Sequence, residues 1–238
     1  MSIVIPAVLV STRKELDETL LRLEGLFDTV QVDIVDGRFA NPPTWPYVQV
    51  SEMDILTGDT QFPSVGKFTF EVDLMVENPE LTVGAWIDAG VSRVLVHIES
   101  ARNFKALIDD LKRRYGHEKG FMSGLLSLGV ALNIDTDTAV LEPYIDSIDY
   151  VQFMGIARIG VQGQPFDRRV LRKIEAFKKA HPAIPLQVDG GVTLETAPDL
   201  LSVGVNQLCV GSALLEAPDL VERLHAFEAL AEAYGRYR

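Results

Sequence analysis

Hydrophobic and polar positions alternate in blocks along the whole chain. Short runs rich in β-branched residues are each followed by a longer, mostly amphipathic segment, which is typical of repeated strand and helix units in a parallel sheet. Eight runs are predicted as strands, at residues 3–8, 30–35, 69–76, 93–98, 127–133, 150–154, 186–189 and 207–210. Eight such units with polar strand ends predict an α/β protein with a single (β/α)8 TIM barrel, spanning residues 1–238 as one domain. The alternative is an open doubly wound sheet.

Three local signals place helix boundaries between these strands. Thr12 and Glu15 have the spacing of a capping box, Asn78 before a proline is expected to cap a helix, and Gly90 stands where a helix should end. Residues 41–67 break the rhythm, because they are rich in Pro, Gly and polar residues without a helical period. An irregular excursion is expected there in place of a helix.

Charge and composition exclude several kinds of partner. The net charge of -12 would repel nucleic acid and anionic membrane surfaces, so neither is expected as a partner. No apolar run reaches membrane-spanning length and no signal segment is visible, so a cytoplasmic protein is expected. Cys209 is the single cysteine, and its apolar neighbours indicate packing rather than reactivity. The sequence leaves open whether the chain forms a homo-oligomer.

Acidic residues gather at the ends of the predicted strands. Gln31 and Asp33 alternate on one strand, Asp73 lies on the next, and Asp189 closes the seventh. In a closed barrel these side chains can converge at one mouth. Three buried carboxylates then require a divalent metal or shared protons with raised pKa values. The alternative is that each aspartate caps a loop or helix, as expected for Asp36.

Glycines follow the last two predicted strands. Gly190 and Gly191 come after the seventh strand, and Gly211 and Ser212 come after the eighth. These are the places where barrels bind phosphate through backbone N–H groups, because glycine allows an anion to approach the backbone closely. Tight turns are the alternative explanation. With phosphate binding at these glycines, the expected ligand is a small phosphorylated sugar.

Seven segments of the chain resemble the ribulose-phosphate 3-epimerase family in order and approximate spacing: residues 32–39, 72–79, 96–99, 129–133, 160–164, 188–192 and 210–213. The resemblance covers nearly the whole chain, although residues 41–67 and 116–124 fit poorly. It implies an isomerase of carbohydrate metabolism that interconverts ketopentose phosphates through an enediolate. It also implies a divalent metal and two aspartates, matched by Asp33 and Asp189, that exchange a proton at C3 on opposite faces of the sugar.

The same resemblance assigns substrate-binding positions. Met75 matches a methionine that lines the family's site. Gly160 and Gly163 match the substrate lid, which usually reads Pro-Gly-Phe-Gly-Gly-Gln and here reads Ile-Gly-Val-Gln-Gly-Gln. A plain surface loop is the alternative for this segment. Related decarboxylases and hexulose-phosphate synthases carry a lysine where Met75 stands, so their chemistry is disfavoured.

The metal site departs from the family pattern. The resemblance implies two histidines and two aspartates as ligands, but Gln31 and Asp73 fill the histidine positions. The expected set of Gln31, Asp33, Asp73 and Asp189 offers only oxygen, which favours magnesium, manganese or calcium over zinc. The alternative is a non-epimerising phosphosugar-binding barrel that has lost the metal. His97, at the end of the fourth strand, could orient substrate or be a structural residue.

Overall fold

Eight parallel strands close into a barrel in the computed structural model, which describes residues 3–57, 60–116, 118 and 126–235. The strands pair in sequence order, and β8 returns to β1. They are β1 (Val4–Val8), β2 (Thr29–Val35), β3 (Thr69–Met75), β4 (Arg93–His97), β5 (Ser127–Leu132), β6 (Tyr150–Met154), β7 (Leu186–Asp189) and β8 (Gln207–Val210). Closure confirms the predicted TIM barrel over the open sheet, and each predicted strand is correct to within one residue at either end.

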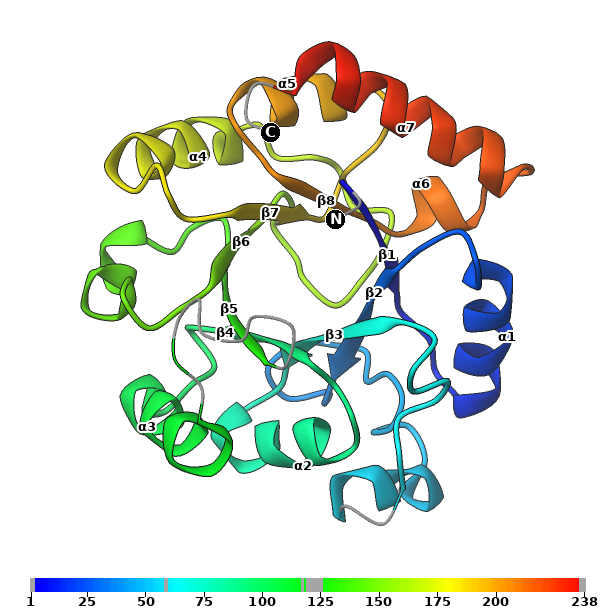
Figure 1. Cartoon of the computed structure of the whole chain (residues 1–238), viewed down its shortest axis with the longest axis vertical. Helices are drawn as coiled ribbons and strands as arrows, with labels where there is room; N and C mark the ends of the chain where they lie inside the picture. Colours follow the sequence, from blue (N-terminus) through cyan, green and yellow to red (C-terminus); the bar gives the residue numbers. More distant parts are fainter. Residues whose placement is uncertain (1–2, 58–59, 117, 119–125, 236–238) are drawn as a thin grey trace.

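Helices surround the barrel on its outer side (Figure 1). The α-helices are α1 (Arg13–Leu23), α2 (Val83–Asp88), α3 (Phe104–Tyr115), α4 (Arg169–Ala180), α5 (Ala197–Ser202), α6 (Ser212–Leu215) and α7 (Leu220–Tyr234). Three short 3-10 helices, η1 (Val50–Thr57), η2 (Pro79–Leu81) and η3 (Thr138–Tyr144), complete the described elements. No helix in the described part of the chain is both long and apolar enough to cross a membrane.

The three predicted helix boundaries are all present in the structure. Thr12 and Glu15 form the capping box of α1, with the Glu15 amide donating to the Thr12 hydroxyl at 3.2 Å. Gly90 follows the end of α2 with φ +104°, a conformation that glycine adopts without strain. Asn78 is the N-cap of η2 with Pro79 at its first position, as predicted, but its backbone is left-handed (φ 53°) and its side chain makes no capping bond.

The excursion between β2 and β3 is less irregular than its sequence suggests. It contains η1, which the sequence did not predict because a 3-10 helix lacks the 3.6-residue period of an amphipathic α-helix. Trp45 in this segment is buried against Phe62 and Trp86, with ring centroids 5.7 and 5.9 Å away. The excursion therefore contributes to the core, and η1 packs against α2.

Polar side chains fill the N-terminal end of the barrel interior. Arg93 donates to the carboxylate of Glu71 at 2.8 Å and lies over the ring of Tyr150, 4.4 Å from its centroid. Gln187 donates to Glu71 as well. Gly129 makes room for this arrangement, since a Cβ at that position would lie 2.2 Å from the Tyr150 ring. This paired network closes the barrel below the mouth, so the open end lies at the C-terminal ends of the strands.

Candidate active site

A cavity of about 190 Å³ occupies the C-terminal mouth of the barrel. The loop after β6 crosses this mouth toward β1 and β2 (Figure 1). All residues that the sequence assigned to substrate or phosphate binding line the cavity, together with Asp33 and Asp189: Met75, Gly160, Gly163, Gly190, Gly191, Gly211 and Ser212. The structure therefore brings together residues from β2, β3, β7 and the loops after β6, β7 and β8 at one place.

Asp33 and Asp189 contribute two buried carboxylates to this cavity. Their strands, β2 and β7, are separated in the barrel by β1 and β8. Burial and the neighbouring carboxylates of Asp189 and Asp73 raise the pKa of Asp33 well above its ordinary value. Burial, followed by the charge of Asp73, raises the pKa of Asp189 to about 7. Asp189 can therefore hold a proton near neutral pH, and Asp33 holds its proton more tightly than an ordinary aspartate, as suits general acid–base catalysis.

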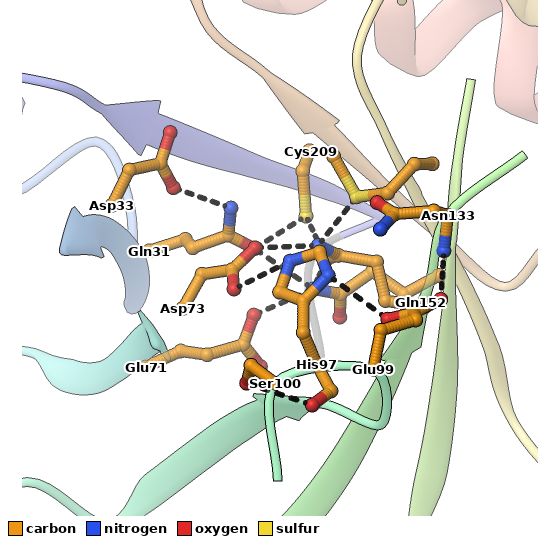
Figure 2. Close-up of polar contacts among 12 residues, drawn as sticks. Gln31, Asp33, Glu71, Asp73, His97, Glu99, Ser100, Asn133, Gln152 and Cys209 are labelled. Carbon is orange, nitrogen blue, oxygen red and sulfur yellow. Dashed lines mark hydrogen bonds and ion pairs between the residues drawn. The ribbon is translucent and has the colours of Figure 1, made fainter. Parts of the chain in front are cut away.

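Gln31 lies beneath the cavity and does not line it. Its amide nitrogen donates to Asp33 Oδ1 at 2.9 Å. Its carbonyl oxygen accepts from the amide nitrogen of Gln187 at 3.1 Å and from the thiol of Cys209 at 3.1 Å. The carbonyl thus faces the barrel interior, and the nitrogen faces the aspartate (Figure 2).

Asp73 is also fully buried below the cavity, beside Asp33 in the paired strands. One of its oxygens lies 3.3 Å from His97 Nε2, and the other accepts from the amide nitrogen of Gln152 at 2.9 Å. The opposite ring nitrogen of His97 lies 3.6 Å from a Glu99 oxygen. Figure 2 shows the imidazole between these two carboxylates.

The charge state of His97 follows from this geometry. A neutral imidazole has one N–H group, so it could not donate toward carboxylates on both sides. Burial alone would lower the pKa of His97, but Asp73 and Glu99 outweigh it and raise the pKa to about 10. Burial would raise the pKa of Glu99, and the contact with His97 lowers it instead to about 2. His97 is therefore a buried cation between two anions and does not line the cavity.

The four residues expected to bind a metal do not present a suitable donor set. Gln31 turns its nitrogen, which cannot coordinate a cation, toward Asp33. Asp73 already has an ion pair and a hydrogen bond. Within the ranges that the structure describes, no three His, Cys, Asp or Glu side chains are grouped so that they could hold a metal ion. The expectation of magnesium or manganese at Gln31, Asp33, Asp73 and Asp189 therefore does not fit the structure.

The glycines of the β7 loop have structural reasons to be glycine as well as a place in the cavity. Gly190 and Gly191 have φ +90° and +68°. A Cβ at Gly190 would lie 2.6 Å from Ile156, and one at Gly191 would lie 2.9 Å from the backbone of Phe166. The tight-turn and cavity-lining explanations therefore both apply. Gly211 differs, since a Cβ there would meet only the flexible end of Gln162.

The loop of residues 160–164 lies over the mouth and is not a plain surface loop. Gly160 has φ +79° and is packed so closely that a Cβ would lie 3.1 Å from Ala40. The side-chain nitrogen of Gln162 donates to the backbone carbonyl of Ala7 in β1 at 3.2 Å. These contacts hold the loop across the cavity from its origin after β6.

Some residues of the mouth were missed or underestimated from the sequence. Met154 lines the cavity, and Gln152, two residues earlier on β6, bonds to Asp73. A buried glutamine alternating with a methionine could have indicated an inward-facing polar strand. Cys209 does pack against Ile5, as expected, but it also lines the cavity.

Asp36 has the capping role that its sequence context predicted. One of its oxygens accepts from the backbone amides of Arg38 and Phe39 at 2.8 and 3.0 Å. Its other oxygen accepts from the amide of Glu77 at 2.8 Å. Asp36 therefore joins the loops after β2 and β3.

Known structures share this fold across almost the whole chain. 3-Hexulose-6-phosphate synthase superposes with a TM-score of 0.63 at 20% identity, covering 97% of this chain and 99% of that one. KGPDC from Streptococcus mutans superposes with a TM-score of 0.68 at 12% identity, covering 98% and 99%. At these identities the likeness shows the fold alone.

Sequence comparison is more specific. The chain is 31% identical over 233 residues to the chloroplastic ribulose-5-phosphate-3-epimerase of Arabidopsis thaliana, covering 95% of this chain and 76% of the relative. It is 30% identical over 201 residues to ribulose-phosphate 3-epimerase of Bacillus subtilis, covering 82% and 83%. The pattern of the ribulose-phosphate 3 epimerase family matches residues 3–215. The chain therefore belongs to the ribulose-phosphate 3-epimerase family, whose members are isomerases.

Proposed function

We propose that this protein interconverts ketopentose phosphates by proton exchange at C3, with Asp33 and Asp189 as the acid and the base. The observation that carries this proposal is the presence of two buried carboxylates on different strands of one cavity, both with raised pKa values. Carboxyl groups tuned in this way can be protonated and ionised in turn near neutral pH.

The proton transfer balances between these two groups. The ionised aspartate takes the proton from C3, so the C–H bond breaks and an enediolate forms. The protonated aspartate then gives its proton to the opposite face of C3, and the configuration is inverted. At the end the two aspartates have exchanged protonation states, which prepares them for the reverse reaction. No step of this scheme passes through a metal ion.

The phosphate of the substrate is proposed to bind on the β7–β8 side of the cavity. Gly190, Gly191, Gly211 and Ser212 line this side, and backbone N–H groups of their loops are the proposed donors. With a net charge of -12, the chain does not attract an anion at long range, so local N–H groups must do so. A small phosphorylated sugar is therefore the proposed ligand.

Deuterium incorporation tests the proposed reaction. Ribulose 5-phosphate incubated with the protein in D₂O should gain deuterium at C3 and give the epimer. Asp33→Asn and Asp189→Asn should each reduce this rate by about 10³-fold, within the usual range for removing a general acid or base. Asp135→Asn serves as a control, because Asp135 is an exposed partner of Arg169. Exchange in either variant at the wild-type rate would contradict the assignment.

A second candidate function is a barrel that binds phosphosugars without epimerising them. It is favoured by the poor fit of the expected metal donors, since Asp73 is already paired with His97 and Gln152. This function predicts saturable binding of ribulose 5-phosphate in a calorimetric titration with no deuterium at C3. Binding together with C3 exchange would exclude it.

A further inference from the structure

The mouth of the barrel holds its carboxylates with donors from the protein itself. Asp33, Asp73 and Asp189 share a buried region, where uncompensated negative charge is costly. Each carboxylate group therefore needs a cation, a donor or a proton. The described contacts show which of these is used at Asp33 and Asp73.

At Asp33 the partner is an amide. The end of Gln31 that faces Asp33 is its NH₂ group, which donates to Asp33 Oδ1 at 2.9 Å. The other end is fixed independently, because Gln187 and Cys209 both donate toward it. Turning the Gln31 carbonyl toward the mouth would remove these two bonds and place an oxygen against Asp33. The orientation is therefore determined by three neighbours.

At Asp73 the partners are an imidazole and an amide. His97 faces one carboxylate oxygen at 3.3 Å, and the Gln152 amide donates to the other at 2.9 Å. His97 is fully buried and has Glu99 on its far side, so its ring is held in place. A metal bound to Asp73 would lie close to one of these partners, the His97 ring at Oδ1 or the Gln152 amide at Oδ2.

We propose that the mouth works without a bound divalent metal, because Gln31, Gln152 and His97 hold Asp33 and Asp73 where a cation would otherwise be needed. In this arrangement Gln152 and His97 are positioning residues, which act through Asp73 and do not contact the substrate. The part of the inference that concerns turnover rests on the proposed epimerase function. The part that concerns metal binding does not.

The first experiment measures metal binding directly. The purified protein is first analysed for its metal content and dialysed against EDTA. It is then titrated with Mn²⁺, and electron paramagnetic resonance measures the free Mn²⁺ at each step. We expect a metal content far below one equivalent and no saturable Mn²⁺ binding. One tightly bound Mn²⁺ that is lost in Asp33→Asn or Asp73→Asn would overturn the inference.

A matched variant shows that the assay can detect a site. The double substitution Gln31→His and Asp73→His places an imidazole at each of these two positions. Histidine is the residue that the family resemblance implies at both. This variant should bind Mn²⁺ or Zn²⁺ measurably where the wild type does not. If the double variant fails to fold, the wild-type titration still decides, with EDTA as the Mn²⁺-binding positive control.

The second experiment follows C3 deuterium exchange after EDTA treatment. The exchange rate should be unchanged by chelation and should not rise on adding Mg²⁺ or Mn²⁺. A rate that falls at least tenfold with EDTA and returns with metal would overturn the inference. Should ribulose 5-phosphate show no exchange under any condition, the proposed function fails, but the Mn²⁺ titration still tests the metal-free mouth separately.

Gln152→Leu tests the positioning role. Loss of this donor should lower kcat for C3 exchange about tenfold while leaving KM near its wild-type value, because the substrate does not touch Gln152. Gln152→Asn keeps an amide and should recover part of the rate. Equal loss in both variants, or a change confined to KM, would contradict this role.

Discussion

The two sides of the mouth satisfy their polar groups in different ways. On the β7–β8 side, the residues around Gly190 and Gly211 face an open cavity. On the β3–β4 side, Asp73 and Glu99 are paired with His97 and lie outside it. The glycine-rich loops of the first side suit the close approach of a substrate anion, whereas the carboxylates of the second side already face His97. One side of the mouth is therefore suited to bind a ligand, and the other side holds the buried carboxylate of Asp73 in place.

The largest effect is expected when His97 is removed from the β3–β4 side. His97→Gln leaves the buried carboxylate of Asp73 without its charged partner, so the free energy of unfolding should fall by about 3–5 kcal/mol. Urea unfolding followed by circular dichroism measures it. His225→Gln, at an exposed position on α7, is the control.

A double variant separates charge from packing at this position. Adding Asp73→Asn to His97→Gln removes one of the unpaired charges and should recover part of the lost stability. No recovery would mean that the imidazole acts by shape, and the β3–β4 side would not be an electrostatic unit.

Asp189 lies on the β7–β8 side, at the end of β7. Its pKa is raised from 3.8 to about 7 in the folded state, so the folded protein holds this proton more tightly than the unfolded chain. The stability gained in this way is full below pH 3.8 and is lost as the pH rises through about 7. The wild type should therefore lose about 2 kcal/mol relative to Asp189→Asn between pH 5 and pH 7.

Urea midpoints of the two proteins at several pH values measure this difference. Asp135→Asn, which changes an exposed carboxylate, should run parallel to the wild type. A wild type that gains stability relative to Asp189→Asn over the same range would show that the pKa of Asp189 is not raised.

The smallest effect is expected on the open side. Ser212→Asp places a negative charge beside the proposed phosphate position and should weaken binding of ribulose 5-phosphate about tenfold, or 1.4 kcal/mol. Ser212→Asn has a similar shape without the charge and should weaken binding less. Isothermal titration calorimetry measures both. Equal affinities for the two variants would place the phosphate elsewhere in the cavity.

Much of the barrel and part of the site could be predicted from local sequence. Strand positions follow from β-branched runs, and a side-chain period of two already places Gln31 and Asp33 on the same face. The glycines after β7 and β8 stand at strand ends, so their place at the mouth follows once the barrel is assumed. The 3-10 helix η1 escaped this reasoning, because its residues show no α-helical period.

Local sequence places the polar groups at the mouth, but their partners depend on how the barrel closes. The end of the Gln31 amide that faces Asp33 depends on Gln187 and Cys209, which donate to its carbonyl oxygen. These residues lie 156 and 178 residues away in the chain. Asp73 meets Gln152 from a strand 79 residues further on. An amide has a donor end and an acceptor end, and its orientation depends on neighbours that only barrel closure brings together.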